Sequence, residues 1–498
     1  MNNNLDITQR SSITLPGYEA QLNDDGVAHS KQKVENSANE LVTNNLVGRN
    51  AITMIPCSKQ SETLSYRSTV AFQVITNIDD NNNNSNINNT NTNTNTVHYA
   101  MRQNRKAVFL CADYFPIATP RIQNVMKLVM KAFNTNGRTE NFDQENEDED
   151  EEAVASISSK FEYLKTNLSS VSFVSSWNCD MDCIVTFNYD KPMENERERE
   201  LEAEALCSKC GISTLILRSK KKKIVAGSRK DHPYIRDKVY ISITNKDNLE
   251  EITTYLDKEV GMEGRHCSSA PSKVITVQYE KPQDAFQHPN HNAMLHALEW
   301  MLTRLRKIRS DYGRDNNKVD QHHLNLLEMY CGCGAHTMAI AKAEIFHSIT
   351  TVELDNRLVE ACRKNAKING CTGEQSSKQG RNTPINIFQG DAGDWSRKYL
   401  KHFNKSEPSL FNKVYQVLLV DPPRSGLDRR VCELAKTGSF EHIIYISCGR
   451  EALKGDILEL SDMFEVIDCT ILDLFPRTDS VESLVHLQRK SNRESNKK

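Results

Sequence analysis

The most regular pattern of apolar positions lies in the C-terminal half of the chain. From Asn292 onward, short apolar runs alternate with segments of helical period. We expect five buried strands, at 324–330, 348–354, 385–389, 414–420 and 442–447. Two later runs, 464–474 and 483–487, are expected to complete the edge of the sheet. Short apolar strands that alternate with helices predict a doubly wound, mostly parallel α/β sheet.

The pattern before residue 286 predicts a different, α+β layer. A helical period runs over 120–133, and a second, charged helix is predicted at 194–206. Short strands are predicted around these helices, at 66–76, 106–112, 171–174, 184–187, 214–217 and 239–243. We therefore expect an α+β region over 61–285 and a doubly wound domain over 286–498.

Three stretches interrupt these patterns. Residues 1–60 are rich in Asn, Ser and acidic residues and have no sustained period, which predicts disorder. An Asn/Thr tract near 78–98 and a mostly acidic run near 138–155 are interpreted as insertions without chemistry. The acidic run would repel a phosphate backbone, so we expect it to loop away from any RNA-binding face.

Charge and cysteine content narrow the class of protein. The formal net charge of −3 gives no general attraction to nucleic acid, so RNA would have to bind a local patch. The densest basic patch is 218–223 with Arg229 and Lys230, and a solvated linker or an import-like run explains it almost as well. No apolar run reaches about 18 residues, so no membrane span is expected. The 14 irregularly spaced cysteines indicate reduced thiols inside the cell, in the cytoplasm and as a second option the nucleus.

A glycine turn follows the first predicted strand of the doubly wound domain. Residues 331–334 read Cys-Gly-Cys-Gly, and glycines allow a backbone to approach a ligand at a helix N-terminus. Glu353 follows the second strand, where a carboxylate can contact a ribose diol, and a helix cap is the alternative. Asp391 fits an adenine contact and a helix cap equally well. The missing third glycine of a pyrophosphate fingerprint favours S-adenosyl-L-methionine over NAD.

Two further strand ends carry reactive groups. The fourth strand leads into Asp421-Pro422-Pro423-Arg424, where consecutive prolines would hold Asp421 rigidly at the carboxyl edge of the sheet. Arg424 could bind a phosphate or orient a base, with a surface ion pair as the alternative. The fifth strand ends at Cys448, where an α/β enzyme displays a nucleophile, although a lone strand cysteine is more often a core residue.

Several of these segments together resemble the tRNA (uracil-5-)-methyltransferase family. The motifs that carry the resemblance are 327–332, 421–428, 445–448 and Phe475-Pro476 followed by Val481-Glu482. The match is strong from Phe286 to the end of the chain and weaker over 66–133 and 171–223. Gly449-Arg450 stands where the family has Asn-Pro, and Ala335 where some relatives have a polar residue.

The resemblance implies methyl transfer from S-adenosyl-L-methionine to carbon 5 of a tRNA uridine, uridine 54 of the T-loop by family precedent. Cys448 matches the nucleophile that adds to carbon 6, and Glu482 matches the base that later removes the carbon-5 proton. Cofactor contacts carry over to Tyr330, Gly332, Glu353 and Asp421, with His288 in place of the family's Gln. The implied fold is a Rossmann-like methyltransferase sheet preceded by an RNA-binding region that helps to extrude the base.

Other interpretations remain open at this point. Cys179, Cys183, Cys207 and Cys210 form C-x3-C and C-x2-C pairs that could hold a metal, but we expect reduced structural thiols and no metal site. Phe115 could stack on an RNA base or lie in the core. The predicted partner is tRNA, bound by a monomer without protein partners. Ribosomal RNA is the alternative substrate, and a non-catalytic tRNA-binding or folding protein is the alternative class.

Overall fold

The computed structural model divides the chain into two compact units. Unit 1 comprises Met1–Asp24 and Thr63–Ile235, and unit 2 comprises Asp25–Glu62 and Arg236–Lys498. The structure describes the chain except for residues 1–17, 19–23, 60–61, 63, 77–96, 104–105, 110–114, 135–160, 178–181, 247–248, 256–272, 284–287, 315–323, 373–382, 403–412 and 492–498. Both predicted insertions fall largely outside the described residues.

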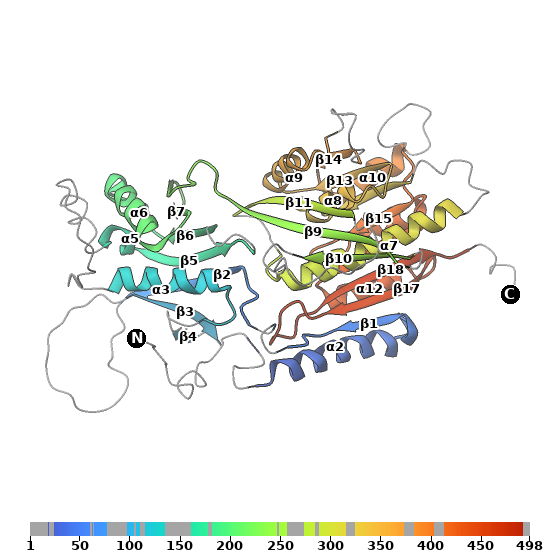
Figure 1. Ribbon diagram of the computed structural model, residues 1–498, viewed down its shortest axis with the longest axis horizontal. Coiled ribbons are helices and arrows are strands. Elements are labelled where there is room, and N and C mark those ends of the chain that lie inside the picture. Colours follow the sequence, from blue (N-terminus) through green and yellow to red (C-terminus); the bar gives the residue numbers. More distant parts are fainter. Residues whose placement is uncertain are drawn as a thin grey trace. The chain divides into compact units, whose positions relative to one another are not determined.

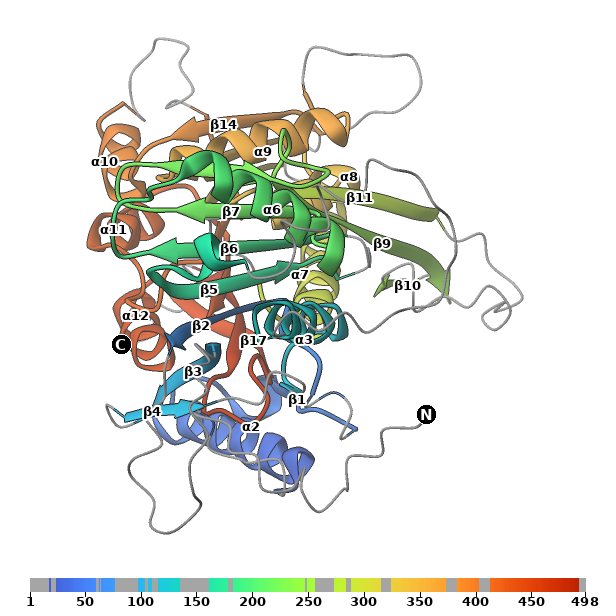
Figure 2. The ribbon, with the colours of Figure 1, turned by 90° about the vertical axis from the view of Figure 1, so that its left-hand side faces the viewer.

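Unit 1 is a seven-stranded sheet covered by helices, as expected for the α+β region. Its strand order is β4-β3-β2-β5-β6-β7-β8, and only β6 and β7 are parallel, because α6 connects them. The strands are β2 (Thr69–Thr76), β3 (Val97–Gln103), β4 (Lys106–Phe109), β5 (Leu168–Ser175), β6 (Cys183–Tyr189), β7 (Thr214–Arg218) and β8 (Lys223–Ala226). Helices α3 (Pro120–Asn134) and α6 (Glu196–Cys210) pack against this sheet (Figure 2), and the short helix α5 (Glu162–Lys165) contacts α6.

Unit 2 is built on a mostly parallel eight-stranded sheet, which confirms the predicted fold class. Its order is β1-β17-β18-β16-β15-β12-β13-β14, and Figure 1 shows it from β14 at the top of the unit to β1 at the bottom. The strands are β1 (Ile52–Ile55), β12 (Asn325–Met329), β13 (Ser348–Glu353), β14 (Ile385–Gln389), β15 (Val417–Val420), β16 (His442–Ser447), β17 (Phe464–Leu472) and β18 (Glu482–Arg489). Only β18 runs antiparallel to its neighbours.

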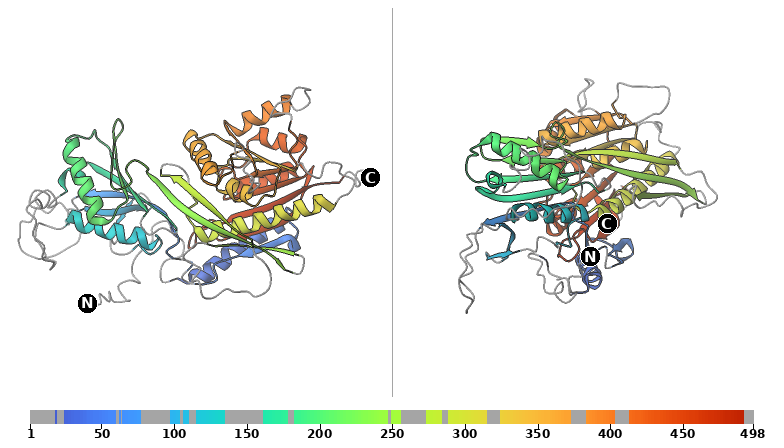
Figure 3. Two further views of the ribbon diagram at one scale, coloured as in Figure 1. Left: turned by 45° about the horizontal axis from the view of Figure 1, so that its top comes forward. Right: turned by 60° about the vertical axis from the view of Figure 1, so that its left-hand side comes forward.

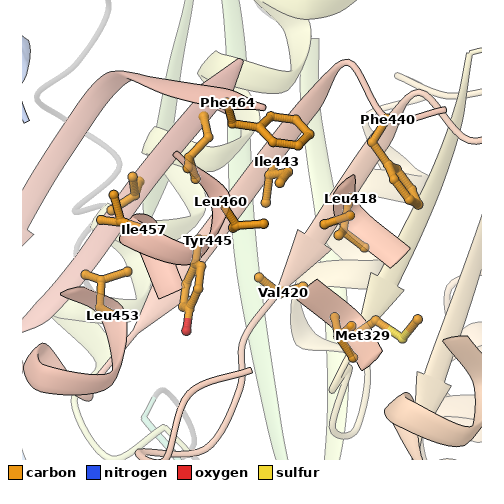
Figure 4. Packing of buried hydrophobic residues seen from close by; sticks show 14 of the residues in the cluster. Met329, Leu418, Val420, Phe440, Ile443, Tyr445, Leu453, Ile457, Leu460 and Phe464 are labelled. Atoms are coloured by element: carbon orange, nitrogen blue, oxygen red, sulfur yellow. The ribbon is translucent and has the colours of Figure 1, made fainter. Parts of the chain in front are cut away.

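Helices cover both faces of this sheet. One face packs against α2 (Gly26–Thr43), α10 (Ala392–His402), α11 (Arg429–Thr437) and α12 (Arg450–Leu460) through one large apolar cluster. Figure 4 shows part of it, with Leu453 and Ile457 of α12 packed near Ile443 and Tyr445 of β16. Helices α7 (His291–Arg314), α8 (Ala335–Lys342) and α9 (Asn356–Ile368) contact the sheet as well. None of the helices in the described part of the chain is suited to spanning a membrane.

A smaller three-stranded sheet packs on the helices of unit 2. It consists of β9 (Tyr234–Lys246), β10 (Leu249–Tyr255) and β11 (Lys273–Pro282), in the order β10-β9-β11. Strand β10 contacts α7, and β11 contacts α8 and α9 (Figure 3). Lys281 of β11 and Asp237 of β9 form a buried ion pair with a nitrogen–oxygen distance of 2.5 Å. This pair joins the two strands in a region whose sequence predicted only 239–243 as a strand.

The prediction of disorder over residues 1–60 is wrong for the described segment after residue 24. Asp25 caps α2 by accepting from two backbone N–H groups, and 3-10 helix η1 (Arg49–Ala51) leads into β1. The apolar stripe of α2 is only Val34, Ala38 and Leu41, too sparse among polar residues to indicate a helix from sequence alone. Strand β1 pairs in parallel with β17 and forms the sheet edge, which the C-terminal runs were expected to form.

Candidate active site

The predicted site residues of unit 2 gather at one edge of the eight-stranded sheet. Tyr330, Asp421 and Cys448 each follow the last residue of a parallel strand, and Glu353 is the last residue of β13. Because β18 is antiparallel, its first residue, Glu482, lies at the same edge. The carboxyl ends of parallel strands are where open α/β sheets bind ligands. Topology therefore brings together residues that are far apart in sequence.

Cys448 and Glu482 face each other across the ladder between β16 and β18. The last pair in this ladder joins Ser447 to Ser483. One step further along antiparallel strands places Cys448 opposite Glu482, a position where Cα atoms are typically about 4.5–5.5 Å apart. Glu482 is buried, whereas Cys448 is half-buried. A thiol and a carboxyl group are thus placed side by side at the ends of two adjacent strands.

The acidic groups at this edge are held in an environment that disfavours negative charge. Burial raises the pKa of Asp421 to about 7. Burial and, to a smaller extent, the nearby Asp421 raise the pKa of Glu482, while Arg424 opposes this shift. The pKa of the Cys448 thiol is raised by burial, then by Glu482 and Asp421, and is lowered by Arg424. Both carboxyl groups and the thiol are therefore poised to exchange protons rather than fixed as anions.

Two electropositive features counteract the effect of burial on the pKa of the Cys448 thiol. Arg424 lies beside the thiol and also donates to the Ser480 hydroxyl at 3.5 Å. Helix α12 begins at Arg450, two residues after the cysteine, so its N-terminal backbone dipole favours a thiolate. The strand-to-helix turn at Cys448 is the arrangement in which an α/β fold exposes a nucleophile.

Gly449 allows the loop 421–428 to pack directly behind Cys448. A Cβ atom at this position would lie 2.5 Å from the carbonyl oxygen of Arg424 and 3.1 Å from its Cα atom. Asp456 of α12 fixes the far end of the loop, because its carboxylate accepts from Leu427 N–H at 2.9 Å and from the Tyr445 hydroxyl at 2.6 Å. The departure from Asn-Pro at 449–450 thus coincides with a close backbone approach.

The glycine turn after β12 has the conformation of a ligand cradle. Tyr330, Gly332 and Gly334 have φ angles of 63°, 56° and 84°. Left-handed backbone is costly for a residue such as Tyr and is typical of functional turns. A Cβ atom at Gly332 would have no neighbour within 4 Å among the described residues, so the turn leaves space on that side. Gly334 instead faces Cys362, whose sulfur would lie 2.7 Å from an added Cβ atom.

Glu353 is fixed to this turn by its carboxylate. One oxygen accepts from Gly332 N–H at 3.0 Å, and the other accepts from Asp355 N–H at 2.8 Å. Capping of the next helix, the alternative role considered for Glu353, is performed by Asp355, whose side chain accepts from Arg357 N–H at the start of α9. Each Glu353 oxygen keeps acceptor capacity beyond one backbone bond, which a ribose diol could use. Asp391, in contrast, caps α10 by accepting from Asp394 N–H at 2.9 Å.

Two neutral histidines extend the site beyond the strand ends. His288 Nδ1 lies 2.9 Å from the Asn290 carbonyl oxygen, which can only accept, so Nδ1 carries the proton and Nε2 is an acceptor. Burial lowers the pKa of His288 to about 3 and that of His336 to about 4. His336 Nδ1 lies 4.0 Å from an Asp421 oxygen. His336 could have been noticed in the sequence only from its place two residues after the glycine turn.

Known proteins share both the sequence pattern and the fold. The model of the family described as tRNA (Uracil-5-)-methyltransferase matches residues 269–490. A tRNA/tmRNA (uracil-C(5))-methyltransferase of Campylobacter lari is 26% identical over 396 residues, covering 79% of this chain and 86% of that protein. Its counterpart in Stutzerimonas stutzeri is 27% identical over 395 residues, covering 79% and 84%. From residue 269 to residue 490, the chain is therefore similar to the tRNA (uracil-5-)-methyltransferase family.

A solved structure supports the fold of this chain. It is a Pyrococcus abyssi tRNA (uracil-54, C5)-methyltransferase in complex with S-adenosyl-L-homocysteine, with a TM-score of 0.51 and 15% sequence identity. The likeness covers 93% of this chain and 84% of that chain. The predicted fold is thereby confirmed, and the predicted resemblance and enzyme class agree with the matching family model and relatives.

Side chains of unit 1 that were considered for RNA or metal binding are mostly structural. Phe115 is buried and packs edge-on against Phe72, with 5.2 Å between ring centroids, so it is a core residue. Arg229 pairs with Asp182 at 2.5 Å, and Lys230 pairs with Glu204 at 3.0 Å. The remaining basic patch is the turn between β7 and β8, where lysines 220–223 are exposed. Lys222 there pairs with Glu196 of α6.

The three described cysteines of the pairs in unit 1 lie in the core. Cys183, Cys207 and Cys210 are buried, and burial raises the pKa of each thiol to about 12, which disfavours the thiolate that a metal requires. Cys179 lies outside the described residues. Among the residues that the structure describes, no group of three or more potential ligands is placed to hold a metal ion.

Proposed function

We propose that this enzyme methylates carbon 5 of uridine 54 in the T-loop of tRNA through a covalent bond between Cys448 and the uracil base. Methylation of a tRNA uracil at carbon 5, with S-adenosyl-L-methionine as methyl donor, is supported by the similarity to this family. Uridine 54 as the target position is carried over from the family resemblance, and the covalent intermediate rests on the arrangement at the sheet edge. The observation that supports it is that Cys448 and the buried Glu482 come directly after and directly before the last pair of the ladder between β16 and β18.

The first step needs a nucleophile from the enzyme to activate the base, because carbon 5 of uracil is itself only weakly nucleophilic. The Cys448 thiolate adds to carbon 6, and the electron pair of the C5–C6 double bond moves into an enolate, which makes carbon 5 nucleophilic. Arg424 and the N-terminus of α12 stabilise the thiolate. Asp421 and the neutral His336 line the same edge, where they can hold the polar edge of the base.

The residues at the glycine turn fit the cofactor. Gly332 leaves space beside the turn, and Glu353 offers acceptor oxygens where a ribose diol would lie. Tyr330, Asp421 and His288 complete the proposed set, with His288 contributing an acceptor nitrogen in place of the family's Gln amide. When bound, the cofactor supplies an electrophilic methyl group to carbon 5.

The last step needs a base. The proton on carbon 5 passes to Glu482, its bonding electrons restore the C5–C6 double bond, and the carbon–sulfur bond breaks to release the Cys448 thiolate. Burial holds the pKa of Glu482 above its ordinary value, so its carboxylate is a stronger base than an exposed glutamate. Glu482 lies beside the leaving Cys448 thiolate. Because the carboxylate takes up the proton as the thiolate leaves, the two groups need not be negatively charged at the same time.

The Glu482→Gln variant tests this assignment. With a T-arm RNA and cofactor, we expect a methylated covalent adduct to accumulate on a denaturing gel, because the amide cannot remove the proton. Cys448→Ala should form no adduct and transfer no methyl group but should still bind the RNA. An enzyme that turns over normally without Cys448 would contradict the covalent mechanism, and methylation of ribosomal RNA but not of tRNA would contradict the substrate.

A further inference from the structure

The N-terminal helix α2 reaches the loop that leads into Glu482. The ammonium group of Lys33 donates to the carbonyl oxygens of Phe475 and Thr478 at 2.8 Å each and of Ser480 at 3.1 Å. It also forms an ion pair of 2.5 Å with Asp473. Both charged side chains are buried. Lys33 thus contacts the loop 473–481 along most of its length. This loop follows β17 and precedes Glu482, the first residue of β18.

The same helix also contacts the element that follows Cys448. The hydroxyl group of Ser37 accepts from an Arg450 guanidinium nitrogen at 3.2 Å, one helical turn beyond Lys33. Glu40 pairs with Lys454, one turn further along both helices. Helix α2 is therefore in contact with the loop before the proposed base and with the helix after the proposed nucleophile. The family match, over residues 269–490, does not include this helix.

We propose that Lys33 is a positioning residue for the elimination step: it fixes the loop 473–481 and so holds the Glu482 carboxylate against carbon 5 of the base bound to Cys448. The inference rests on the proposed function. A general base acts only within hydrogen-bond reach of the proton it removes. The ladder between β16 and β18 ends at Ser483, and Glu482, the first residue of β18, pairs with Leu472, the last residue of β17. The loop 473–481 connects these two paired residues, so its conformation acts directly on Glu482.

This role has a consequence that a purely structural role lacks. The loop ordered by Lys33 precedes the base, whereas the nucleophile follows a different strand, β16. Loss of the ammonium group should therefore slow removal of the carbon-5 proton more than it slows formation of the carbon–sulfur bond. A displacement of about 1 Å at a catalytic group can lower a rate by about 10²-fold. We expect a decrease of about 10- to 100-fold in turnover, with the adduct as the accumulating species.

The test compares two RNAs in single-turnover reactions of full-length Lys33→Met enzyme. With a uridine T-arm, the adduct should accumulate on a denaturing gel, as in Glu482→Gln. With a 5-fluorouridine T-arm, fluorine replaces the proton that the base must remove, so the adduct is stable and reports only addition and methyl transfer. That adduct should form at the rate of the unaltered enzyme. Lys31→Met, an exposed lysine of the same helix, is the matched control and should behave normally on both RNAs.

In Lys33→Met, the buried carboxylate of Asp473 would lose its ion-pair partner. A second variant therefore distinguishes the loss of loop ordering from the effect of that buried charge. Lys33→Met/Asp473→Asn removes both charges, and we expect it to accumulate the uridine adduct in the same way. Normal turnover of both variants would overturn the inference. An equal loss on uridine and 5-fluorouridine RNA would also overturn it, because Lys33 would then only support folding. Absence of an adduct between unaltered enzyme and 5-fluorouridine RNA would overturn the proposed function itself, and this inference with it.

Discussion

Gly449→Ala is predicted to slow the reaction by moving the loop 421–428 away from Cys448. The added Cβ atom would lie 2.5 Å from the Arg424 carbonyl oxygen, whereas ordinary contacts begin at 3.4 Å. The loop must therefore retreat by about 0.9 Å, and it cannot do so by rotating a side chain, because the contacted atoms are backbone. A shift of this size in Asp421 and Arg424 should lower the rate of adduct formation by about 10²-fold. Overpacking should also destabilise unit 2 by about 1–3 kcal/mol.

The assay is single-turnover adduct formation with 5-fluorouridine T-arm RNA, together with thermal unfolding. Gly455→Ala is the matched control, because Gly455 lies within α12 and an added Cβ atom would have no neighbour within 4 Å. This control should keep full activity and gain about 0.5–1 kcal/mol, since alanine is the better helix former. If Gly449→Ala forms the adduct as fast as Gly455→Ala, the contact with Arg424 does not set the position of the loop, and the reasoning is refuted.

Two further predictions concern charge at the site. Arg424→Gln should shift the pH profile of adduct formation to higher pH, because Arg424 lowers the pKa of the Cys448 thiol and the thiolate is the reactive form; exposed Arg429→Gln is the control, and an unchanged profile would contradict the role of Arg424. Glu353→Gln should raise the dissociation constant for S-adenosyl-L-methionine by about 10-fold, because one oxygen that accepts from backbone N–H becomes a donor, measured by calorimetry against Glu360→Gln. Unaltered affinity would exclude Glu353 as a cofactor contact.

Much of unit 2 could be predicted from the sequence because its central strands are buried on both faces. Such strands read as continuous apolar runs, and β16 was predicted with its observed bounds. The bounds of β14 were also predicted, although this edge strand is only partly buried. The strand ends then indicated Asp421 and Cys448 from position alone. Glu482 could be assigned only by resemblance, because its place at the site depends on β18 running antiparallel between β16 and β17. No local pattern of apolar residues specifies that order.

The parts that escaped prediction depend on contacts between distant segments. Lys33 reads as an ordinary surface residue of a polar helix, and its burial becomes apparent only when α2 is placed beside the loop 473–481. Asp456 is another example. It can accept a hydrogen bond from Leu427 only because the fold places α12 next to the loop 421–428. The glycine at 449 was visible as a departure from the family, but its reason lies in the backbone of Arg424. The spacing of residues along the sequence does not indicate which distant segments come into contact.

The position of α2 also has a consequence for synthesis of the chain. Lys33 and Phe475 are separated by 442 positions, and β1 pairs only with β17, which is near the end of the sequence. At about 5–20 residues per second, the ribosome needs roughly 20–90 s to make the intervening residues. During that interval, α2 lacks both the strand and the loop that it contacts in the finished protein. Assembly of unit 2 can therefore finish only after Phe475 has been synthesised, and until then the apolar stripe of α2 is exposed to chaperones and proteases.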